Sequence, residues 1–201
     1  MELKNLIRAK LARLAPRTLD GEYRGEAAVL IPVFEEQGQP HLLLTVRTEK
    51  VRTHKGQISF PGGMRDGSED LEETALRETQ EEVGIAREQI EILGRYHDYL
   101  AITDYRVVPY AGFVRQPFSA VPQRSEVAEI LKVPFDLFAD PARLRTERML
   151  RSGRMVDVYF YRYGEREIWG LTARIIKDFI EELGWREGGI SETGLETSAG
   201  A

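Results

Sequence analysis

The sequence contains no cysteine. This absence excludes disulfide bonds, zinc sites built from thiolates and catalysis by a cysteine nucleophile. No apolar run approaches the roughly 18 residues that a membrane-spanning helix needs. Residues 1–16 also lack the apolar stretch and small-residue cleavage site of a secretory signal. The sequence therefore predicts a cytoplasmic protein without redox chemistry or a membrane segment.

A large excess of one charge is also missing. The chain has 28 Lys and Arg against 33 Asp and Glu, a net charge of -5, which argues against nucleic acid as a partner. The two signs are nevertheless segregated, because residues 47–55 are mainly basic and residues 69–82 mainly acidic. The basic segment could bind a polyanion and the acidic segment a metal ion. Two unrelated solvated faces are the alternative.

Length and composition predict one folded domain. The 201 residues are 42% hydrophobic and 30% charged, as in globular proteins with a buried core. We expect residues 1–187 to form a single domain, with residues 1–16 as a helix packed on it. The polar, glycine-rich segment 188–201 has no apolar pattern and is expected to be disordered.

Apolar residues recur at helical spacing near both ends of the chain. In the first helix they are Leu3, Leu6, Ile7, Leu11 and Leu14, and Pro16 ends the element. Its opposite face is basic, which fits packing on the domain or, alternatively, a membrane surface. The last helix is predicted over residues 172–183, with Thr172 as the N-cap and Gly184 as the C-cap.

Apolar, β-branched segments predict the strands. Residues 27–34 and 41–46 flank a turn and are expected to form a buried hairpin, in which Pro32 indicates an edge or a bulge. Further strands are predicted over residues 91–100, 107–114, 126–133 and 155–163. Strands on both sides of a central helix predict an α/β (α+β) layered sandwich with a mixed sheet.

The segment 62–85 has the pattern of a chemical site. Asp70 and Glu73 have the spacing of a capping box, which predicts a helix from about residue 71 with Leu71 on its buried face. Glu78 and Glu82 lie one turn apart on one face of that helix, and Glu81 borders it. Carboxylates this close repel one another, and a hard divalent cation offsets that repulsion. A metal ion bound there would suit the cleavage of a phosphoanhydride. The alternative interpretation is an acidic helix that only faces solvent.

The spacing of this segment resembles the Nudix box. Its matching positions are Gly63, Glu69, Arg77, Glu78, Glu81, Glu82, Gly84 and Ile85, and Thr79 replaces a usual aliphatic residue. The resemblance implies a Nudix α/β/α sandwich that uses Mg²⁺, for which Mn²⁺ substitutes. It also implies that Glu78 and Glu82 are the principal metal ligands.

The same resemblance implies roles for the other box residues. Glu81 would be a further metal ligand or the catalytic base, and the Gly63 carbonyl another metal contact. Arg77 would orient a box glutamate, Glu69 would brace the loop against the helix, and Gly84 would serve a structural purpose.

Residues upstream of the box resemble the signature of the coenzyme A pyrophosphatase branch of this family. The matching residues are Leu43, Leu44, Thr45, Arg52, Gly56 and the Phe60–Gly63 run, and residues 168–175 also resemble that branch. The resemblance implies that water attacks the diphosphate of coenzyme A, giving 3′,5′-ADP and 4′-phosphopantetheine. The substrate's phosphates make Arg52, Lys55 and Arg47 candidate contacts, with His54 a further one; each also fits an ordinary surface charge.

The general base and the exact substrate remain open at this point. Glu126 is the first candidate base, because it follows a proline-rich stretch expected to be flexible; Glu129 is the second and Glu81 the third. Another Nudix activity, on ADP-ribose, NADH or a nucleoside triphosphate, would use the same chemistry. A non-catalytic nucleotide-binding module is the rival from another class, although all the box glutamates are retained. The sequence leaves the oligomeric state open between monomer and homodimer.

Overall fold

The computed structural model describes residues 3–48, 56–151, 153–186 and 188–190. The helices are α1 (Leu3–Arg13), α2 (Leu71–Val83), α3 (Phe135–Ala139) and α4 (Leu171–Leu183), with 3₁₀ turns η1 (Arg87–Gln89) and η2 (Pro141–Arg143). The strands are β1 (Gly25–Glu36), β2 (Gln39–Arg47), β3 (Ile58–Ser59), β4 (Gly62–Met64), β5 (Ile90–Arg95), β6 (Tyr99–Leu100), β7 (Tyr105–Val114), β8 (Val127–Pro134), β9 (Leu144–Arg151), β10 (Arg154–Tyr163), β11 (Arg166–Trp169), β12 (Trp185–Arg186) and β13 (Gly189–Ile190).

The largest sheet is mixed and eight-stranded. Its path runs β3-β2-β1-β7-β5, while β4 pairs with β1, β6 with β7 and β8 with β2. Among the described strands of this sheet, only the central pair β1–β7 is parallel, and it aligns residues 25–33 with residues 105–113. The parallel pair needs a long crossover between its strands, and α2 lies in that connection.

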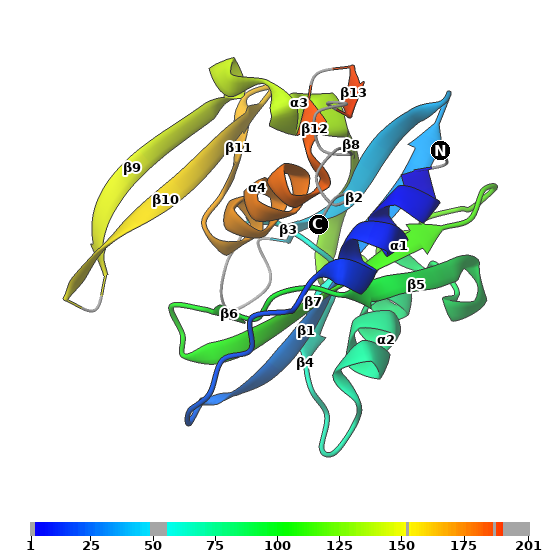
Figure 1. Ribbon diagram of the computed structural model, residues 1–201. Coiled ribbons are helices and arrows are strands. Elements are labelled where there is room, and N and C mark those ends of the chain that lie inside the picture. The colour runs from blue at the N-terminus through cyan, green and yellow to red at the C-terminus, as the bar shows by residue number, and fades with distance from the viewer. Residues whose placement is uncertain (1–2, 49–55, 152, 187, 191–201) are drawn as a thin grey trace, which may run out of the picture.

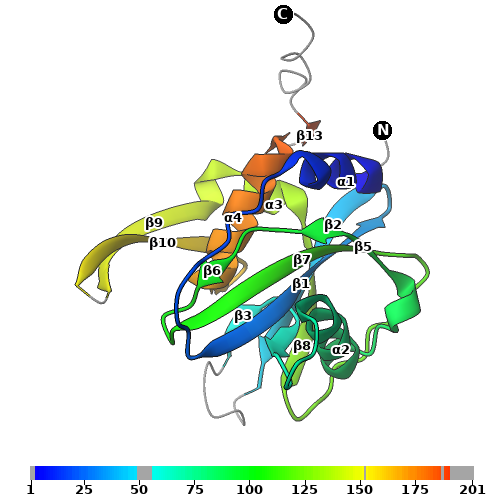
Figure 2. The same ribbon diagram turned by 60° about the horizontal axis from the view of Figure 1, so that its bottom comes forward.

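Helices cover both faces of this sheet (Figures 1 and 2). On one face α2 packs through Ala75, Leu76 and Val83 on even-numbered residues of β1 such as Leu30. On the other face, α1 and α4 pack with odd-numbered residues of β1, such as Ile31, and with even-numbered residues of β2, such as Leu42. Because successive side chains point to opposite faces, both runs of apolar residues in β1 and β2 are buried. The predicted α/β/α sandwich with a mixed sheet is confirmed.

The β1–β2 hairpin is confirmed, with Val33 opposite Leu42. The edge position inferred from Pro32 is wrong, because β1 lies at the centre of the sheet. Along one side of β1, residues 27–29 pair with β4 and residues 33–36 with β2. Pro32 falls between these two pairings, where a missing amide hydrogen costs no bond to either strand.

The first helix packs on the domain, as one of the two alternatives predicted. Its residues Leu3, Leu6, Ile7 and Leu11 are buried. On its basic side, Lys4 and Arg8 pair with Glu91 of β5. In the described segments, no helix combines the length and apolar character needed to cross a membrane. The cytoplasmic location stays a prediction.

Several element boundaries differ from those predicted. The strand expected over 91–100 is divided into β5 and β6, because Tyr96, His97 and Asp98 turn inward and are buried. The N-cap of α4 is Gly170 instead of Thr172, since the helix already begins at Leu171. Gly184 is its C-cap, with a φ of 68°.

A second, three-stranded sheet extends away from the body (Figure 1). Only β10 was expected from the sequence; β9 and β11 pair with it on either side. Beyond α4, β12 and β13 form a short hairpin, so Gly189–Ile190 are extended within the segment expected to be disordered. The remainder, residues 191–201, lies outside the described residues.

Candidate active site

The helix α2 starts where the sequence predicts, but for a different reason. Asp70 is the N-cap residue, yet its side chain makes no capping hydrogen bond. Glu73 instead pairs with Arg87, so the predicted capping box is wrong. The preceding Glu69 binds the helix: its Oε2 accepts a hydrogen bond from Thr74 Oγ1 at 2.8 Å. The side chain that contacts the start of α2 is therefore Glu69, which precedes the helix, and not the Asp70–Glu73 pair that the sequence predicted.

The short strand β4 lies against α2 and carries the glycine pair. Gly62 donates its amide hydrogen to Glu82 Oε2 at 3.2 Å. A Cβ on Gly63 would lie 2.4 Å from the carboxyl carbon of Glu78. The backbone of β4 thus directly borders the carboxylates of Glu78 and Glu82, which the sequence placed one helical turn apart.

Glu82 is the most deeply buried of the box glutamates, with a side chain 5% exposed. Burial is the main cause that raises the pKa of Glu82 to about 7. The charges of Glu78 and Glu126 act in the same direction, whereas the Gly62 amide and Arg47 oppose it. A cation close to Glu82 would remove this cost of burying a carboxylate.

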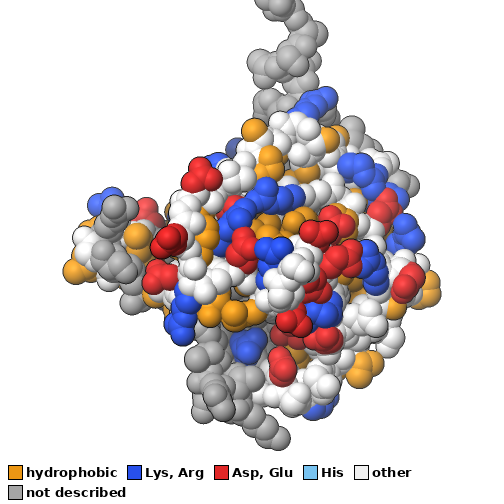
Figure 3. All heavy atoms as spheres, turned by 90° about the horizontal axis from the view of Figure 1, so that it is seen from below, with side chains coloured by type: hydrophobic (Ala, Val, Ile, Leu, Met, Phe, Trp, Pro, Cys, Tyr) orange, Lys and Arg blue, Asp and Glu red, His pale blue; other side chains and the backbone are white. Residues whose placement is uncertain are grey.

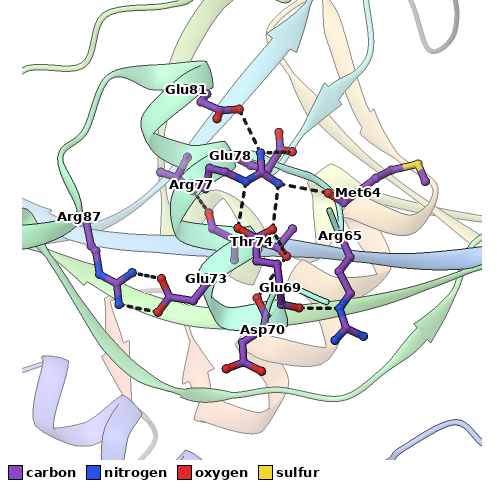
Figure 4. Close-up of polar contacts among 12 residues, drawn as sticks. Met64, Arg65, Glu69, Asp70, Glu73, Thr74, Arg77, Glu78, Glu81 and Arg87 are labelled. Carbon is purple, nitrogen blue, oxygen red and sulfur yellow. Dashed lines mark hydrogen bonds and ion pairs between the residues drawn. The ribbon is translucent and has the colours of Figure 1, made fainter. Parts of the chain in front are cut away.

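Arg77 organises the remaining acidic residues (Figure 4). Its Nε donates to Glu69 Oε1 at 3.0 Å, and its Nη1 lies 2.8 Å from Glu78 Oε1 and 3.1 Å from Glu81 Oε2. The Arg77 hydrogen bond lowers the pKa of Glu69. Burial raises the pKa of Glu78 despite the opposing effect of Arg77. Glu81 is the outermost of these residues, with 58% of its side chain exposed.

Arg47, at the end of β2, faces Glu82. Its Nη1 is 3.7 Å from Glu82 Oε1. Its Nε is buried and, among the described residues, has no hydrogen-bond acceptor. A buried donor without an acceptor is costly, and an anionic ligand that reached this nitrogen would offset that cost.

Glu126 lies in a turn just before β8. Burial is the main cause that raises the pKa of Glu78 and of Glu82, and the charge of Glu126 adds to both shifts. The turn is held by backbone hydrogen bonds on both sides. Gln123 N donates to the Glu82 carbonyl at 2.9 Å, and Thr48 N donates to the Glu126 carbonyl at 2.8 Å. Glu126 directly precedes β8, which agrees with the prediction that it lies at the start of a strand. Glu129 pairs with Arg166 of β11.

The potential metal ligands are carboxylate oxygens, which suit a hard divalent cation. Burial disfavours the charged form of two of these carboxylates, Glu78 and Glu82. Across the segments that the structure describes, no three acidic or histidine side chains already converge to hold a metal. Arg77 holds Glu78 and Glu81 through one carboxylate oxygen each. Each of these two carboxylates keeps a second oxygen that does not contact Arg77, so a metal ion could bind there while Arg77 holds both residues.

Acidic side chains gather on the underside of the molecule, with basic ones beside them (Figure 3). The candidate residues that the structure brings together are Gly63, Glu78, Glu82, Arg47 and Glu126. Arg52, His54 and Lys55 lie outside the described residues. The contact of the Gly62 amide was not expected from the sequence, although the FPGG run contains Gly62. The anchoring of Glu126 through Gln123 and Thr48 was not expected either, because no local pattern gives a signal for it.

Known proteins resemble this chain in sequence and in fold. A family model described as "NUDIX domain" matches residues 24–152. The mouse "Peroxisomal coenzyme A diphosphatase NUDT7" is 34% identical, over 85% of this chain and 77% of that protein. An "Uncharacterized Nudix hydrolase NudL" of Photorhabdus laumondii is 36% identical, over 84% of this chain and 89% of its own length.

A solved structure, "MutT/nudix family protein from Enterococcus faecalis", shares the fold with a TM-score of 0.52. It is 17% identical and covers 92% of this chain and 76% of that one. The family match spans more than half of the chain and includes every box residue described above. The chain is a Nudix hydrolase: it belongs to the Nudix family.

Proposed function

We propose that this protein hydrolyses the diphosphate of coenzyme A to 3′,5′-ADP and 4′-phosphopantetheine, with Mg²⁺ as cofactor and Mn²⁺ as a substitute. The observation that carries the proposal is the arrangement around Glu82. A buried carboxylate with a pKa of about 7 lies beside half-buried Glu78 and beside Arg47, whose Nε is a buried donor without an acceptor among the described residues. One side of the site suits a cation and the other a phosphate.

Each residue has a distinct task in this proposal. Glu78 and Glu82 bind the metal, with Glu81 and the Gly63 carbonyl as further ligands. When bound, Mg²⁺ neutralises charge on the phosphate oxygens and activates the attacking water. Arg77 orients Glu78 through its hydrogen bond, and Glu69 fixes Arg77 in turn. Gly84, with a φ of 68° at the end of α2, closes the helix so that the chain turns away.

Glu126 is the proposed general base, which takes the proton of the attacking water. It is exposed, so water reaches its carboxylate, and its charge is felt by both Glu78 and Glu82. Glu129 is a poorer candidate because Arg166 already pairs with it at 2.7 Å. Glu81 stays an alternative, although Arg77 holds it on the outer side of the helix.

The choice of coenzyme A rests on two supports. The mouse relative is named a coenzyme A diphosphatase. The substrate also carries a 3′-phosphate besides its diphosphate, which suits several cations; Arg47 is one, and Arg52 and Lys55 are the other candidates.

Incubation with Mg²⁺ and a panel of coenzyme A, ADP-ribose, NADH and dATP, with products identified by mass, tests the proposal. We expect 3′,5′-ADP and phosphopantetheine from coenzyme A and slower turnover of the others. Faster cleavage of another panel member would replace the substrate and retain the family chemistry. Absence of turnover with both Mg²⁺ and Mn²⁺ would overturn the catalytic function.

The glycine pair offers a prediction that separates fold from chemistry. A Cβ on Gly62 would meet backbone, 2.4 Å from the Ala28 oxygen, whereas one on Gly63 would meet only the movable carboxyl of Glu78. We expect Gly62→Ala to destabilise the protein by about 3 kcal/mol. Gly63→Ala should leave the melting temperature nearly unchanged while displacing Glu78 and lowering kcat. Urea unfolding and steady-state kinetics of both variants check this, and equal unfolding midpoints would contradict it.

A further inference from the structure

A row of charged side chains leads from the candidate site across β1 and β7. Arg65 follows β4, and its Nη1 donates to Glu26 Oε2 of β1 at 2.6 Å. The other oxygen of Glu26, Oε1, accepts from Arg106 Nη1 of β7 at 2.7 Å. Arg106 Nε in turn donates to Asp98 Oδ2 at 2.7 Å. We call these four residues the Glu26 bridge.

One end of the Glu26 bridge is fixed in the interior. The side chain of Asp98 is 0% exposed and also accepts hydrogen bonds from Arg95 and the Leu19 amide. Glu26 and Arg106 are mostly buried, with 24% and 20% of their side chains exposed. Charged hydrogen bonds in such partly buried surroundings are stronger than surface pairs, so this end gives a rigid reference point.

The other end of the Glu26 bridge holds the loop between β4 and α2. Arg65 Nε donates to the Glu69 carbonyl at 2.5 Å, and the Arg65 amide donates to the Glu26 carbonyl at 2.9 Å. The Arg65 amide thus connects the start of the loop to β1, and the Arg65 guanidinium binds the end of the loop at Glu69. The side chain of Glu69 then holds Arg77, which contacts Glu78 (Figure 4).

The strand that carries Gly62 and Gly63 needs such support. β4 is three residues long, and within the described part of the chain it pairs with β1 alone. The loop after it must nevertheless keep the Gly63 backbone against Glu78 and the Gly62 amide on Glu82. Shifts well below 1 Å are enough to disturb a metal site.

We propose that Glu26 is a positioning residue of the metal site: through Arg65 it fixes the loop that carries Gly63 and Glu69, and thereby the affinity for the divalent cation. This inference rests on the proposed metal-dependent function. Glu26 itself touches neither metal nor substrate. Residues that support metal ligands in this way typically change metal affinity about 10–100-fold when substituted.

The contact at Arg65 depends on geometry as well as charge. Its guanidinium uses Nη1 for Glu26 and Nε for the Glu69 carbonyl at the same time. A lysine ammonium keeps the charge but lacks the planar fork that makes both contacts. Arg65→Lys therefore removes the positioning function without removing a positive charge from the site.

The test measures Mn²⁺ binding to the metal-free protein by electron paramagnetic resonance of the unbound ion, with melting temperatures recorded in parallel. We expect Glu26→Gln and Arg65→Lys each to raise the Kd for Mn²⁺ by about tenfold or more. The matched control is Glu36→Gln, the same substitution at the other end of β1, where the side chain pairs with Lys132. We expect its Kd to stay within about twofold of the parent, because an exposed pair contributes little.

A folded Glu26→Gln or Arg65→Lys protein that binds Mn²⁺ like the parent overturns the inference, as does an equal weakening in Glu36→Gln. If Glu26→Gln does not fold, Arg65→Lys decides. The comparison of the parent with Glu82→Gln tests the metal site separately. If those two proteins bind Mn²⁺ equally, the proposed function fails, and the positioning function fails with it whatever the result at Glu26.

Discussion

Glu82→Gln is expected to lower kcat for coenzyme A hydrolysis about 10³-fold, since a bound metal supplies several kcal/mol of transition-state stabilisation and about 1.4 kcal/mol corresponds to a factor of ten. Glutamine keeps the size of the side chain and an oxygen that accepts the Gly62 hydrogen bond. Only the negative charge is lost. Steady-state kinetics at saturating Mg²⁺ measure the effect, and the matched control is Glu73→Gln on the same helix, where the side chain pairs with Arg87.

Glu82→Gln should lower kcat but increase the stability of the metal-free protein. In a buffer with a chelator, Glu82 is a buried carboxylate, and Arg47 Nη1 lies 3.7 Å from its Oε1. Removing that charge is expected to raise the melting temperature by several °C, because about 1 kcal/mol corresponds to about 2–4 °C in a chain of this size. Mg²⁺ should then raise the melting temperature of the parent but not of the variant. A variant with near-parental kcat, or one less stable than the parent without metal, would contradict the assignment of Glu82.

Glu126→Gln is expected to lower kcat about 10²–10⁴-fold, the contribution of a general base. The Kd for Mn²⁺ should remain close to that of the parent, because Glu126 is assigned to the water and not to the metal. The turn should keep its place, since Gln123 and Thr48 hold it through backbone atoms that the substitution does not alter. Single-turnover kinetics and Mn²⁺ binding separate the two effects.

Glu129→Gln is the control for this variant, because Glu129 lies three residues further along the chain and already pairs with Arg166. We expect its kcat to stay near that of the parent. A kcat of Glu126→Gln within a few-fold of the parent would show that Glu126 is not the base. In that case Glu81 becomes the candidate, and Glu81→Gln should carry the loss instead.

Local patterns predicted the parts of the fold that depend on neighbouring residues. The helix α2, the β1–β2 hairpin and the C-cap at Gly184 follow from periodicity and from single residues with strong conformational preferences. The same patterns failed where a distant partner intervened. Glu73 prefers Arg87 to the cap of its own helix, and Tyr96–Asp98 leave the strand because buried partners lie elsewhere.

The strands β9 and β11 show another limit. β9 reads LRTERMLR, which is mainly polar and lacks the alternation of a half-buried strand. It becomes a strand because β10 supplies its backbone hydrogen bonds along eight residue pairs. Ion pairs such as Arg148 with Asp157 then replace apolar burial on its exposed part.

For the site, the sequence by itself determined the helix that bears Glu78, Glu81 and Glu82, and the residues of the box, because these groups lie within a few turns of one another. The tertiary structure alone decided which carboxylate is buried, that Arg47 faces it, and that Glu126 arrives on an anchored turn. It also decided that Glu26 and Asp98 support the loop from outside the box. Burial and ion pairing depend on which strands lie side by side, and no spacing along the chain encodes that directly.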